Sequence, residues 1–190
     1  MRLCVTRHGE TDFNVQKRYT GSTDIPLNAK GVSQAEELAS KLSNTQFDVI
    51  VSSSLLRAKQ TAEIVNKSLN TPIVFMDEFQ EICMGVYQGL TQKEAEEQYP
   101  ETWTRLAKTW KKTGSKPVDD APEGGETLRQ FDARIAAGLA KLKAEYADCK
   151  VLLVCHGFAV QIIDRQLEGL DFSEMGTFIL GNCEIAEYVV

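Results

Sequence analysis

A chain of 190 residues, of which 43% are hydrophobic, is long enough to bury one substantial core, and its length does not require a second domain. The 21 basic residues are outnumbered by 27 acidic ones, which gives a net charge of -6, and no cluster of lysine and arginine suggests a nucleic-acid partner. An anion-binding site must therefore concentrate positive charge locally, because the mean field of the molecule repels anions.

The amino-terminal segment turns polar directly after Val5, so it lacks the apolar core of a signal peptide. No segment reaches membrane-spanning length, and we therefore expect a cytoplasmic protein without membrane contact. The five cysteines are odd in number and form no C-x-x-C pair, which favours reduced, mostly buried thiols over a disulfide framework or a zinc site.

Short apolar, β-branched runs alternate with longer amphipathic stretches, which is the pattern of βαβ units around a mainly parallel sheet. The runs that predict buried strands are Leu3 to Val5, Val49 to Val51, Ile73 to Phe75 and Val151 to Cys155. We therefore expect a three-layer α/β sandwich with a mainly parallel central sheet.

Three stretches carry apolar residues three or four positions apart, the spacing of helices that each turn one stripe toward a sheet. The first stripe contains Val32, Ala35, Leu38, Ala39 and Leu42, and the second contains Leu55, Ala58, Ala62 and Val65. The third, which predicts the longest helix, follows Gly124 and Gly125 and contains Leu128, Phe131, Ile135, Leu139, Leu142 and Tyr146.

Residues 78–123 interrupt this alternation, because their composition is polar and glycine and proline recur as breakers. Within this excursion (residues 78–123), Thr91 to Gln98 predicts a short helix, and Trp103, Leu106 and Trp110 predict a second one with an aromatic face. We expect the excursion to form a cap over the sheet, within a single domain that spans residues 1–190.

The last β-branched run, Ile185 to Val190, predicts an antiparallel strand at the edge of the sheet. Glu184 and Glu187 would be costly in a strand that is covered on both faces. An exposed edge of this kind could pair with its counterpart in a homodimer.

The only two histidines, His8 and His156, each follow a predicted parallel strand and each precede a glycine. In open α/β sheets, ligands bind outside the carboxyl ends of strands, and glycine there exposes the amides of the next helix. Arg7 precedes one histidine, and Arg57 lies in the first turn of a helix, where a cation opposes the helix dipole but suits a bound anion. Each of these residues taken singly also fits a structural or surface role, whereas together they predict an anion site.

Several blocks of residues, in order along essentially the whole chain, resemble the histidine phosphatase superfamily, which includes cofactor-dependent phosphoglycerate mutases and many small phosphatases. The blocks are Thr6 to Thr11, the segment around Arg57, Glu81 followed by Gly85 and Gly89, Pro122 to Glu126, and Cys155 to Gly157. The resemblance implies an enzyme that hydrolyses a small phosphorylated metabolite without a metal or another cofactor.

By this resemblance, His8 is the nucleophile that forms a phosphohistidine, and Glu81 protonates the leaving alcohol and then activates water. Spacing alone does not distinguish Glu81 from Glu78. The phosphate-binding residues implied are Arg7, Asn14, Arg57, His156 and Gly157, and Thr20 and Gly21 match a substrate-side loop of the mutases. The aromatic residues that could contact substrate are Phe13, Tyr19, Tyr99, Trp103 and Trp110.

Two alternatives stay open. A phosphoglycerate mutase is favoured by Gln88 to Leu90, but Trp110 to Ala121 lacks the paired arginines that mutases use for the substrate carboxylate, and Pro122 to Glu126 is phosphatase-like. A catalytically inactive phosphate-binding module is the remoter alternative, because the core residues are all present. A cysteine phosphatase is excluded, since no arginine lies six positions after any cysteine, and no serine-hydrolase, nucleotide-loop or zinc-protease motif occurs.

Overall fold

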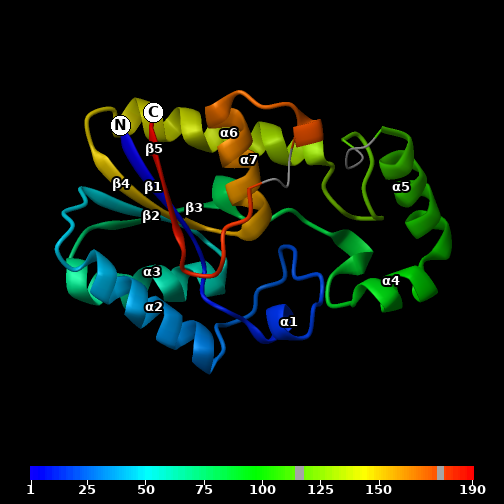
Figure 1. Cartoon of the computed structure of the whole chain (residues 1–190), viewed down its shortest axis with the longest axis horizontal. Coiled ribbons are helices and arrows are strands. Elements are labelled where there is room, and N and C mark those ends of the chain that lie inside the picture. Colours follow the sequence, from blue (N-terminus) through cyan, green and yellow to red (C-terminus); the bar gives the residue numbers. More distant parts are fainter. Residues whose placement is uncertain (114–117, 175–177) are drawn as a thin grey trace.

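A five-stranded sheet forms the centre of the molecule, with its strands in the order β3-β2-β4-β1-β5 (Figure 1). The strands are β1 (Arg2–Arg7), β2 (Val49–Ser53), β3 (Ile73–Met76), β4 (Lys150–Cys155) and β5 (Ile185–Val189). The first four run parallel, and β5 runs antiparallel to β1 at the edge, which confirms the predicted sheet. The computed structural model describes residues 1–113, 118–174 and 178–190, and it gives the backbone alone at residues 108–113.

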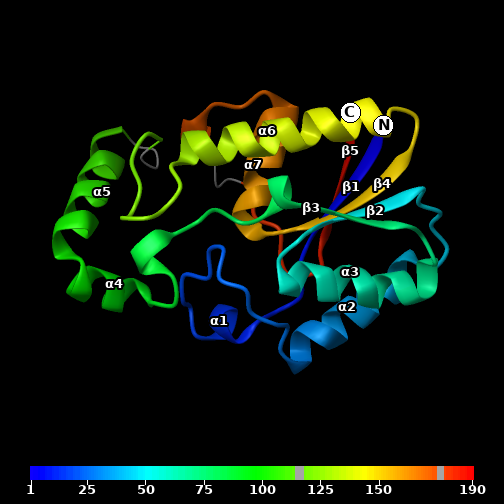
Figure 2. The same cartoon turned by 180° about the vertical axis from the view of Figure 1, so that it is seen from behind.

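Helices cover both faces of the sheet (Figures 1 and 2). On one face lie α2 (Ala29–Leu42) and α3 (Leu56–Leu69), and on the other lie α6 (Leu128–Glu145) and α7 (Gly157–Glu168). The connections contain the short helix α1 (Asp12–Val15) and 3₁₀ turns at Asp77–Phe79, Gly85–Tyr87 and Phe172–Glu174. The expected three-layer α/β sandwich is therefore confirmed.

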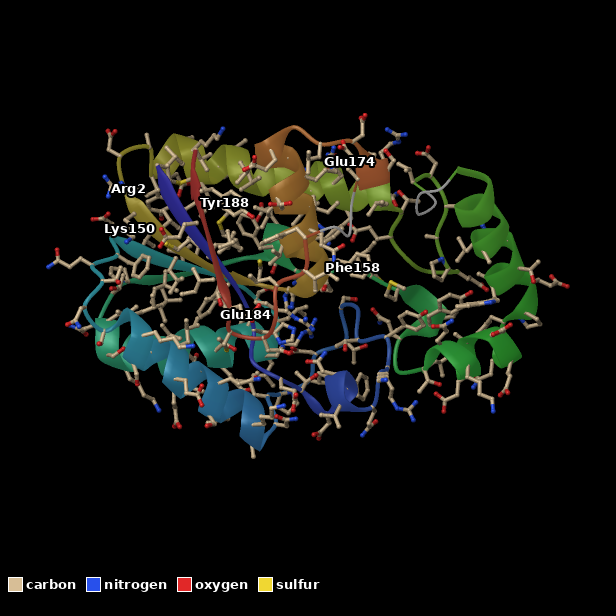
Figure 3. All side chains as sticks on the ribbon, viewed as in Figure 1. Arg2, Lys150, Phe158, Glu174, Glu184 and Tyr188 are labelled. Atoms are coloured by element: carbon tan, nitrogen blue, oxygen red, sulfur yellow. The ribbon has the colours of Figure 1, made fainter. Side chains whose placement is uncertain are left out.

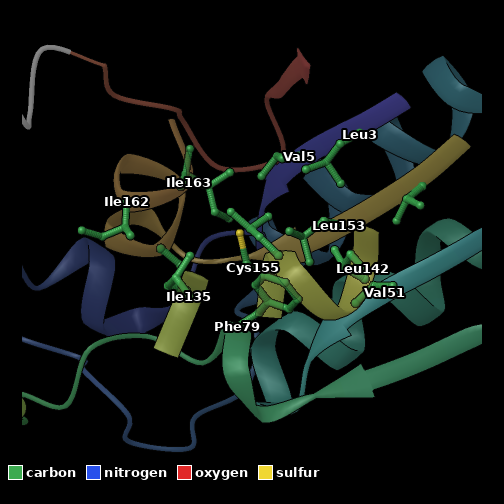
Figure 4. Close-up of a cluster of buried hydrophobic side chains, with 14 of the residues drawn as sticks. Leu3, Val5, Val51, Phe79, Ile135, Leu142, Leu153, Cys155, Ile162 and Ile163 are labelled. Carbon is green, nitrogen blue, oxygen red and sulfur yellow. The ribbon is translucent and has the colours of Figure 1, made fainter. Parts of the chain in front are cut away.

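The central strand β4 shows why the predicted strands read as continuous apolar runs. Leu152 and Val154 pack against α2 and α3, whereas Val151, Leu153 and Cys155 pack in the opposite cluster with α6 and α7 (Figure 4). Successive side chains of a strand point to opposite faces, so a strand covered on both faces needs apolar residues at every position.

The apolar stripe of α2 begins one residue earlier than its spacing predicted. Val32 is 37% exposed, and Gly31 takes the buried position instead. The backbone of Glu10 lies so close to Gly31 that a Cβ there would collide with it. Neighbouring helical residues are rotated by about 100° from each other, which turns Val32 away from the face that Gly31 presents. The other predicted members of the stripe are buried.

The longest helix is α6, as predicted, and its first turn is well capped. The side chain of Thr127 accepts from the backbone N–H of Gln130, and the side chain of Gln130 accepts from the backbone N–H of Thr127. The stripe from Leu128 to Leu142 is buried, and Tyr146 ends the helix as its C-cap residue.

The excursion contains both of its predicted helices, α4 (Gln92–Gln98) and α5 (Pro100–Thr113), which project beyond one end of the sheet (Figure 1). Thr91 lies just before α4 as its N-cap residue, and it forms a capping box with Glu94. The side chain of Trp110 lies outside the described residues.

The carboxyl ends of the parallel strands point toward this same end of the molecule. Arg2 and Lys150, at the amino ends of β1 and β4, lie at the far end of the sheet, whereas Phe158 lies where β4 has passed into α7 (Figure 3).

No helix in the described part of the chain is both long and apolar enough to cross a lipid bilayer. All five cysteines are free thiols, and Cys4, Cys155 and Cys183 are buried.

Candidate active site

The register of the sheet brings the two histidines together. Arg7 of β1 pairs with Cys155 of β4, so His8 and His156 are the next residues of two adjacent parallel strands. The backbone N–H of His8 donates to the carbonyl of Cys155 at 3.0 Å, and the two imidazole rings lie 5.1 Å apart between centroids. Both residues are buried, with 4% of His8 and none of His156 exposed.

The hydrogen bonds of His8 define which of its ring nitrogens is basic. Nδ1 lies 2.7 Å from the carbonyl oxygen of Gly9, which can only accept, so Nδ1 carries the hydrogen. Nε2 is then an acceptor, and Nε of Arg57 donates to it at 3.2 Å. Burial, followed by the charges of Arg57 and Arg7, holds the pKa of His8 well below its usual 6.5. His8 is therefore a neutral imidazole at neutral pH, with a lone pair on Nε2.

Arg57 is a buried side chain with 1% exposure, so it is not the surface arginine that its sequence position also allowed. Its Nη1 donates to the carbonyl of Thr23 and its Nη2 to the carbonyl of Gly21, both at 2.8 Å. Burial lowers the pKa of Arg57 to about 10, which leaves the guanidinium charged at neutral pH. A fixed, charged group therefore contacts the basic nitrogen of His8.

Gly21 helps to position Arg57 through its backbone. The residue has φ 53°, a region that favours glycine, and a Cβ there would collide with Oε1 of Gln88. That oxygen accepts from the backbone N–H of Ser22 at 2.8 Å and from the Ser22 hydroxyl at 2.9 Å. The loop around Gly21 that binds Arg57 is thus itself hydrogen-bonded to the excursion through Gln88.

Arg7 presents donors that the protein does not fully use. Its Nη1 donates to the carbonyl of Leu180 at 3.3 Å, whereas its buried Nε has no partner in the described chain. The guanidinium packs over Gly157, where a Cβ would lie about 3.5 Å from the Arg7 Nε and Cζ atoms. Burial lowers the pKa of Arg7 below its usual value. Arg7 therefore has N–H groups available for an anion beside His8.

The carboxylate of Glu81 lies at the amino-terminal end of α7. It accepts backbone N–H groups from Phe158 at 3.0 Å, from Ala159 at 3.2 Å and from Ile82 at 3.1 Å. Burial raises the pKa of Glu81 above 4.5, and these hydrogen bonds and the charge of Arg57 oppose that rise only in part. A carboxyl group with a raised pKa, next to an anion site, is suited to carry a proton.

The structure separates Glu81 from Glu78, which the sequence could not do. Glu78 forms an ion pair with Lys141 on the surface of α6. Glu81 instead lines the cavity that contains Arg7 and His8.

Arg134 of α6, which the sequence analysis missed, holds the segment that carries Glu81. It donates at 3.0 Å to the carbonyl of Gln80 and at 3.4 Å to that of Glu81. Its Nε and Nη2 also bind the two carboxylate oxygens of Glu126 at 3.0 and 2.7 Å. The backbone N–H of Glu126 donates to the carbonyl of Cys83 at 2.9 Å, so both ends of the excursion are joined at its base.

A cavity of about 160 Å³ is lined by most of the predicted site residues, although not by His156 or Trp103. It is lined by Arg7, His8, Asn14, Arg18, Tyr19, Thr20, Gly21, Arg57, Glu81, Ile82, Met84, Gly157 and Phe158. Arg18 and the apolar lining residues Ile82, Met84 and Phe158 were not predicted from the sequence, although Phe158 directly follows the Cys155 to Gly157 block.

Asn14 reaches the cavity with its amide oxygen already engaged. Its Oδ1 accepts from the backbone N–H of Thr11 at 3.0 Å, in the capping box of α1. The Asn14 amide nitrogen is therefore the group that can donate to a ligand.

Trp103 does not reach the cavity. Its ring lies 6.3 Å from that of Tyr87, which stacks at 5.8 Å on Tyr19, so Trp103 meets the cavity only through two other aromatic rings. Tyr99 also lies against Tyr87, at 6.1 Å. Of the predicted aromatic residues, Tyr19 lines the cavity directly.

Within the described ranges, no three His, Cys, Asp or Glu side chains are grouped as a metal site would require. The guanidiniums of Arg7 and Arg57 act on both His8 and His156, and the carboxyl group of Glu81 lies close enough to act on both guanidiniums. This arrangement can hold a phosphoryl-sized oxyanion between fixed donors, next to a basic nitrogen and a proton donor.

The buried histidines predict a stability that falls in acid. Their pKa values in the folded state lie well below 6.5, so between that pH and the folded values the unfolded chain binds more protons. The free energy of unfolding should therefore decrease as pH falls below about 6.5, by about 1.4 kcal/mol per histidine for each pH unit. The raised pKa of Glu81 makes the opposite contribution to this pH dependence, but it can cancel the contribution of at most one of the two histidines.

Urea unfolding between about pH 7.5 and 5.5 measures this dependence. A His8→Asn variant, which removes one of the two groups, serves as the control, and its slope should be smaller by about 1.4 kcal/mol per pH unit. A free energy of unfolding that is constant over this range in the unmodified protein would contradict the neutral state assigned to both rings.

Comparisons with known proteins agree with this geometry. The family described as the histidine phosphatase superfamily (branch 1) matches residues 3–190. The chain is 38% identical over 181 residues to the uncharacterized phosphatase PhoE of Bacillus subtilis, covering 95% of this chain and 84% of that protein. It is 31% identical over 191 residues to the probable phosphoglycerate mutase GpmB of Salmonella choleraesuis, with 98% and 83% covered.

Among solved structures, the chain is similar to a putative alpha-ribazole-5'-P phosphatase from Escherichia coli, with a TM-score of 0.90 and 26% identity. The match covers 98% of this chain and 89% of that one. The fold, the family match and the named relatives therefore all indicate the same family.

Proposed function

This chain belongs to the histidine phosphatase superfamily (branch 1), and from that premise we propose that it hydrolyses a small phosphomonoester through a phosphohistidine at His8. The observation that carries the proposal is the neutral, buried imidazole of His8, whose Nε2 accepts from the guanidinium of Arg57 and whose ring also lies in the field of Arg7. Arg7 and Arg57 supply fixed positive charge for the phosphoryl oxygens in a molecule whose net charge is negative.

In the first step, Nε2 of His8 attacks phosphorus while the bond between phosphorus and the ester oxygen breaks. Phosphate binding draws the Nε–H of Arg57 from His8 to a phosphoryl oxygen, which frees the lone pair. The leaving alkoxide takes the proton held by Glu81, so the product departs as a neutral alcohol.

In the second step, water attacks the phosphorus of phosphohistidine. The carboxylate of Glu81 accepts a proton from that water as the P–N bond breaks and His8 recovers its lone pair. Inorganic phosphate leaves, and Glu81 is again protonated. His156 donates to the phosphoryl group, with further donors from the Asn14 amide and the Gly157 backbone.

The proposed reaction needs no metal ion or other cofactor, and the proposed location is the cytoplasm. The chain acts as one catalytic domain over residues 1–190, with the excursion as its cap. The site residues on the substrate side are Thr20, Gly21 and Tyr19, which line the cavity.

A phosphoglycerate mutase is the second candidate, because the similarity to GpmB favours it. A mutase must bind the carboxylate of its substrate as well as the phosphate. Besides Arg7 and Arg57, the described cation that lines the cavity is Arg18. Its Nη1 donates to the carboxylate of Glu94 and to the carbonyl of Gly89, both at 2.7 Å. That pairing supports the hydrolase.

Hydrolysis of p-nitrophenyl phosphate with and without EDTA tests the proposal. We expect turnover that survives EDTA, and a panel of phosphorylated metabolites should then contain a substrate with a higher kcat/KM. A mutase would instead need bisphosphoglycerate and would interconvert phosphoglycerates faster than it releases phosphate. Activity that EDTA abolishes and a divalent metal restores would contradict the metal-independent mechanism.

A further inference from the structure

Ser53, the last residue of β2, makes a buried hydrogen bond to the second histidine that the reaction described above does not use. Its Oγ lies 2.7 Å from Nε2 of His156, and neither residue has any exposed surface. The sheet register explains the contact, because Ser52 pairs with Val154 and the following residues of the two strands lie side by side.

The hydrogen bonds of Ser53 determine the direction of this contact. The backbone N–H of Leu55 donates to the Ser53 Oγ at 3.3 Å, so the hydroxyl oxygen already acts as an acceptor there. The hydroxyl hydrogen then needs an acceptor of its own, and Nε2 of His156 is the other partner of this oxygen in the described structure. If Nε2 donated instead, the hydroxyl hydrogen would be buried without an acceptor, which is costly.

The other nitrogen of the His156 ring, Nδ1, carries the hydrogen of the neutral ring. Burial, followed by the charge of Arg57, holds the pKa of His156 well below 6.5, so the ring is neutral and carries one hydrogen. With Nε2 accepting from Ser53, that hydrogen lies on Nδ1. Nδ1 is buried and has no partner in the part of the chain that the structure describes.

We propose that Ser53 is a positioning residue that holds His156 in the Nδ1–H tautomer, so that Nδ1 donates to a phosphoryl group bound beside His8. The role in catalysis rests on the proposed phosphatase function, whereas the tautomer is a property of the resting protein. A hydrogen bond to one ring nitrogen commonly sets the proton on the other, and a wrong tautomer would turn a lone pair toward the phosphoryl oxygens.

Ser52 provides a matched control on the same strand. It is also fully buried, but its side chain points to the opposite face, and its hydroxyl donates to the backbone carbonyl of Ser53 at 2.9 Å. Ser52→Ala and Ser53→Ala therefore remove the same group from adjacent buried positions, and only one of the two loses a bond to His156.

Nitrogen NMR of the protein labelled with ¹⁵N-histidine reads the tautomer directly, because the chain has only two histidines and a His8→Asn variant leaves the signals of His156 alone. We expect a protonated Nδ1 and an unprotonated Nε2 at His156 in the unmodified protein and in Ser52→Ala. In Ser53→Ala, the Nε2–H form should gain population. For p-nitrophenyl phosphate, kcat should fall by about 10- to 100-fold in Ser53→Ala, with little change in KM.

Three results would overturn the proposal: a protonated Nε2 at His156 in the unmodified protein, an unchanged tautomer in Ser53→Ala, or an equal loss of kcat in Ser52→Ala. Titration with inorganic phosphate separates this proposal from the proposed function. A shift of the His156 Nδ1–H signal on phosphate binding supports the donor role even if no ester is hydrolysed, in which case the phosphatase function fails alone. No shift at saturating phosphate removes the donor role.

Discussion

Replacing His8 by alanine is expected to lower kcat for p-nitrophenyl phosphate by about a millionfold, the scale seen when a catalytic nucleophile is removed. The second of the two imidazoles does not replace it, since Nε2 of His156 is engaged with Ser53. The same variant should also lose the acid-labile phosphate that the unmodified protein acquires from radiolabelled substrate during turnover. Steady-state kinetics and quenched labelling measure these two losses separately.

Glu10→Gln is the control for this variant. Glu10 lies two residues further along the same loop, but its carboxylate bonds to Lys30 and Asn28 outside the cavity. We expect this control to turn over at the normal rate and to become labelled. Normal turnover in His8→Ala, or acid-labile labelling of that variant, would refute His8 as the nucleophile.

The effect of Glu81→Gln should depend on the leaving group. An alkyl phosphate needs a proton on its departing oxygen, so its kcat should fall by about 10²- to 10⁴-fold in this variant. The p-nitrophenolate ion leaves without that proton, and its release should slow much less. Because phosphohistidine breakdown also needs Glu81 as a base, phosphorylated protein should accumulate with p-nitrophenyl phosphate. Burst kinetics and quenched labelling measure this accumulation.

Glu78→Gln is the matched control, because Glu78 is the glutamate that spacing could not separate from Glu81 and it pairs with Lys141 outside the cavity. We expect no change in kcat for either substrate in this control. Equal losses for both substrates in Glu81→Gln, without accumulation of phosphorylated protein, would remove Glu81 from the acid and base role.

The meeting of the two histidines could be predicted from the sequence because it depends on periodic patterns. Parallel strands end at one edge of a sheet, and each histidine follows such a strand directly, so the pairing of Arg7 with Cys155 brings them together. The buried faces of the helices could be predicted from apolar spacing in the same way, except at Val32. Gly31 takes the buried position there, because the backbone of Glu10 lies close to it.

Contacts between segments that are distant in the chain could not be predicted in this way. Arg134 bonds to the carbonyl of Glu81, which lies 53 residues earlier, and nothing in the local spacing of α6 distinguishes it from an exposed arginine such as Arg129. The choice of Glu81 over Glu78 likewise depends on where a loop lies against α7, and loops carry no periodic signal. Trp103 was expected near substrate from its residue type, but helix packing turned it toward Tyr87.

The closed base of the excursion has a consequence for how this architecture can vary. Glu126 is bonded to Cys83, and Arg134 of α6 bonds both to Glu126 and to the carbonyl of Glu81, so the intervening residues form a loop whose two ends already touch. Doubling the length of a flexible loop costs only about 0.6 kcal/mol in closure entropy. Insertions or deletions in α4 and α5 can thus reshape the surface beyond the cavity while Glu81, the proposed proton donor, stays in place beside it.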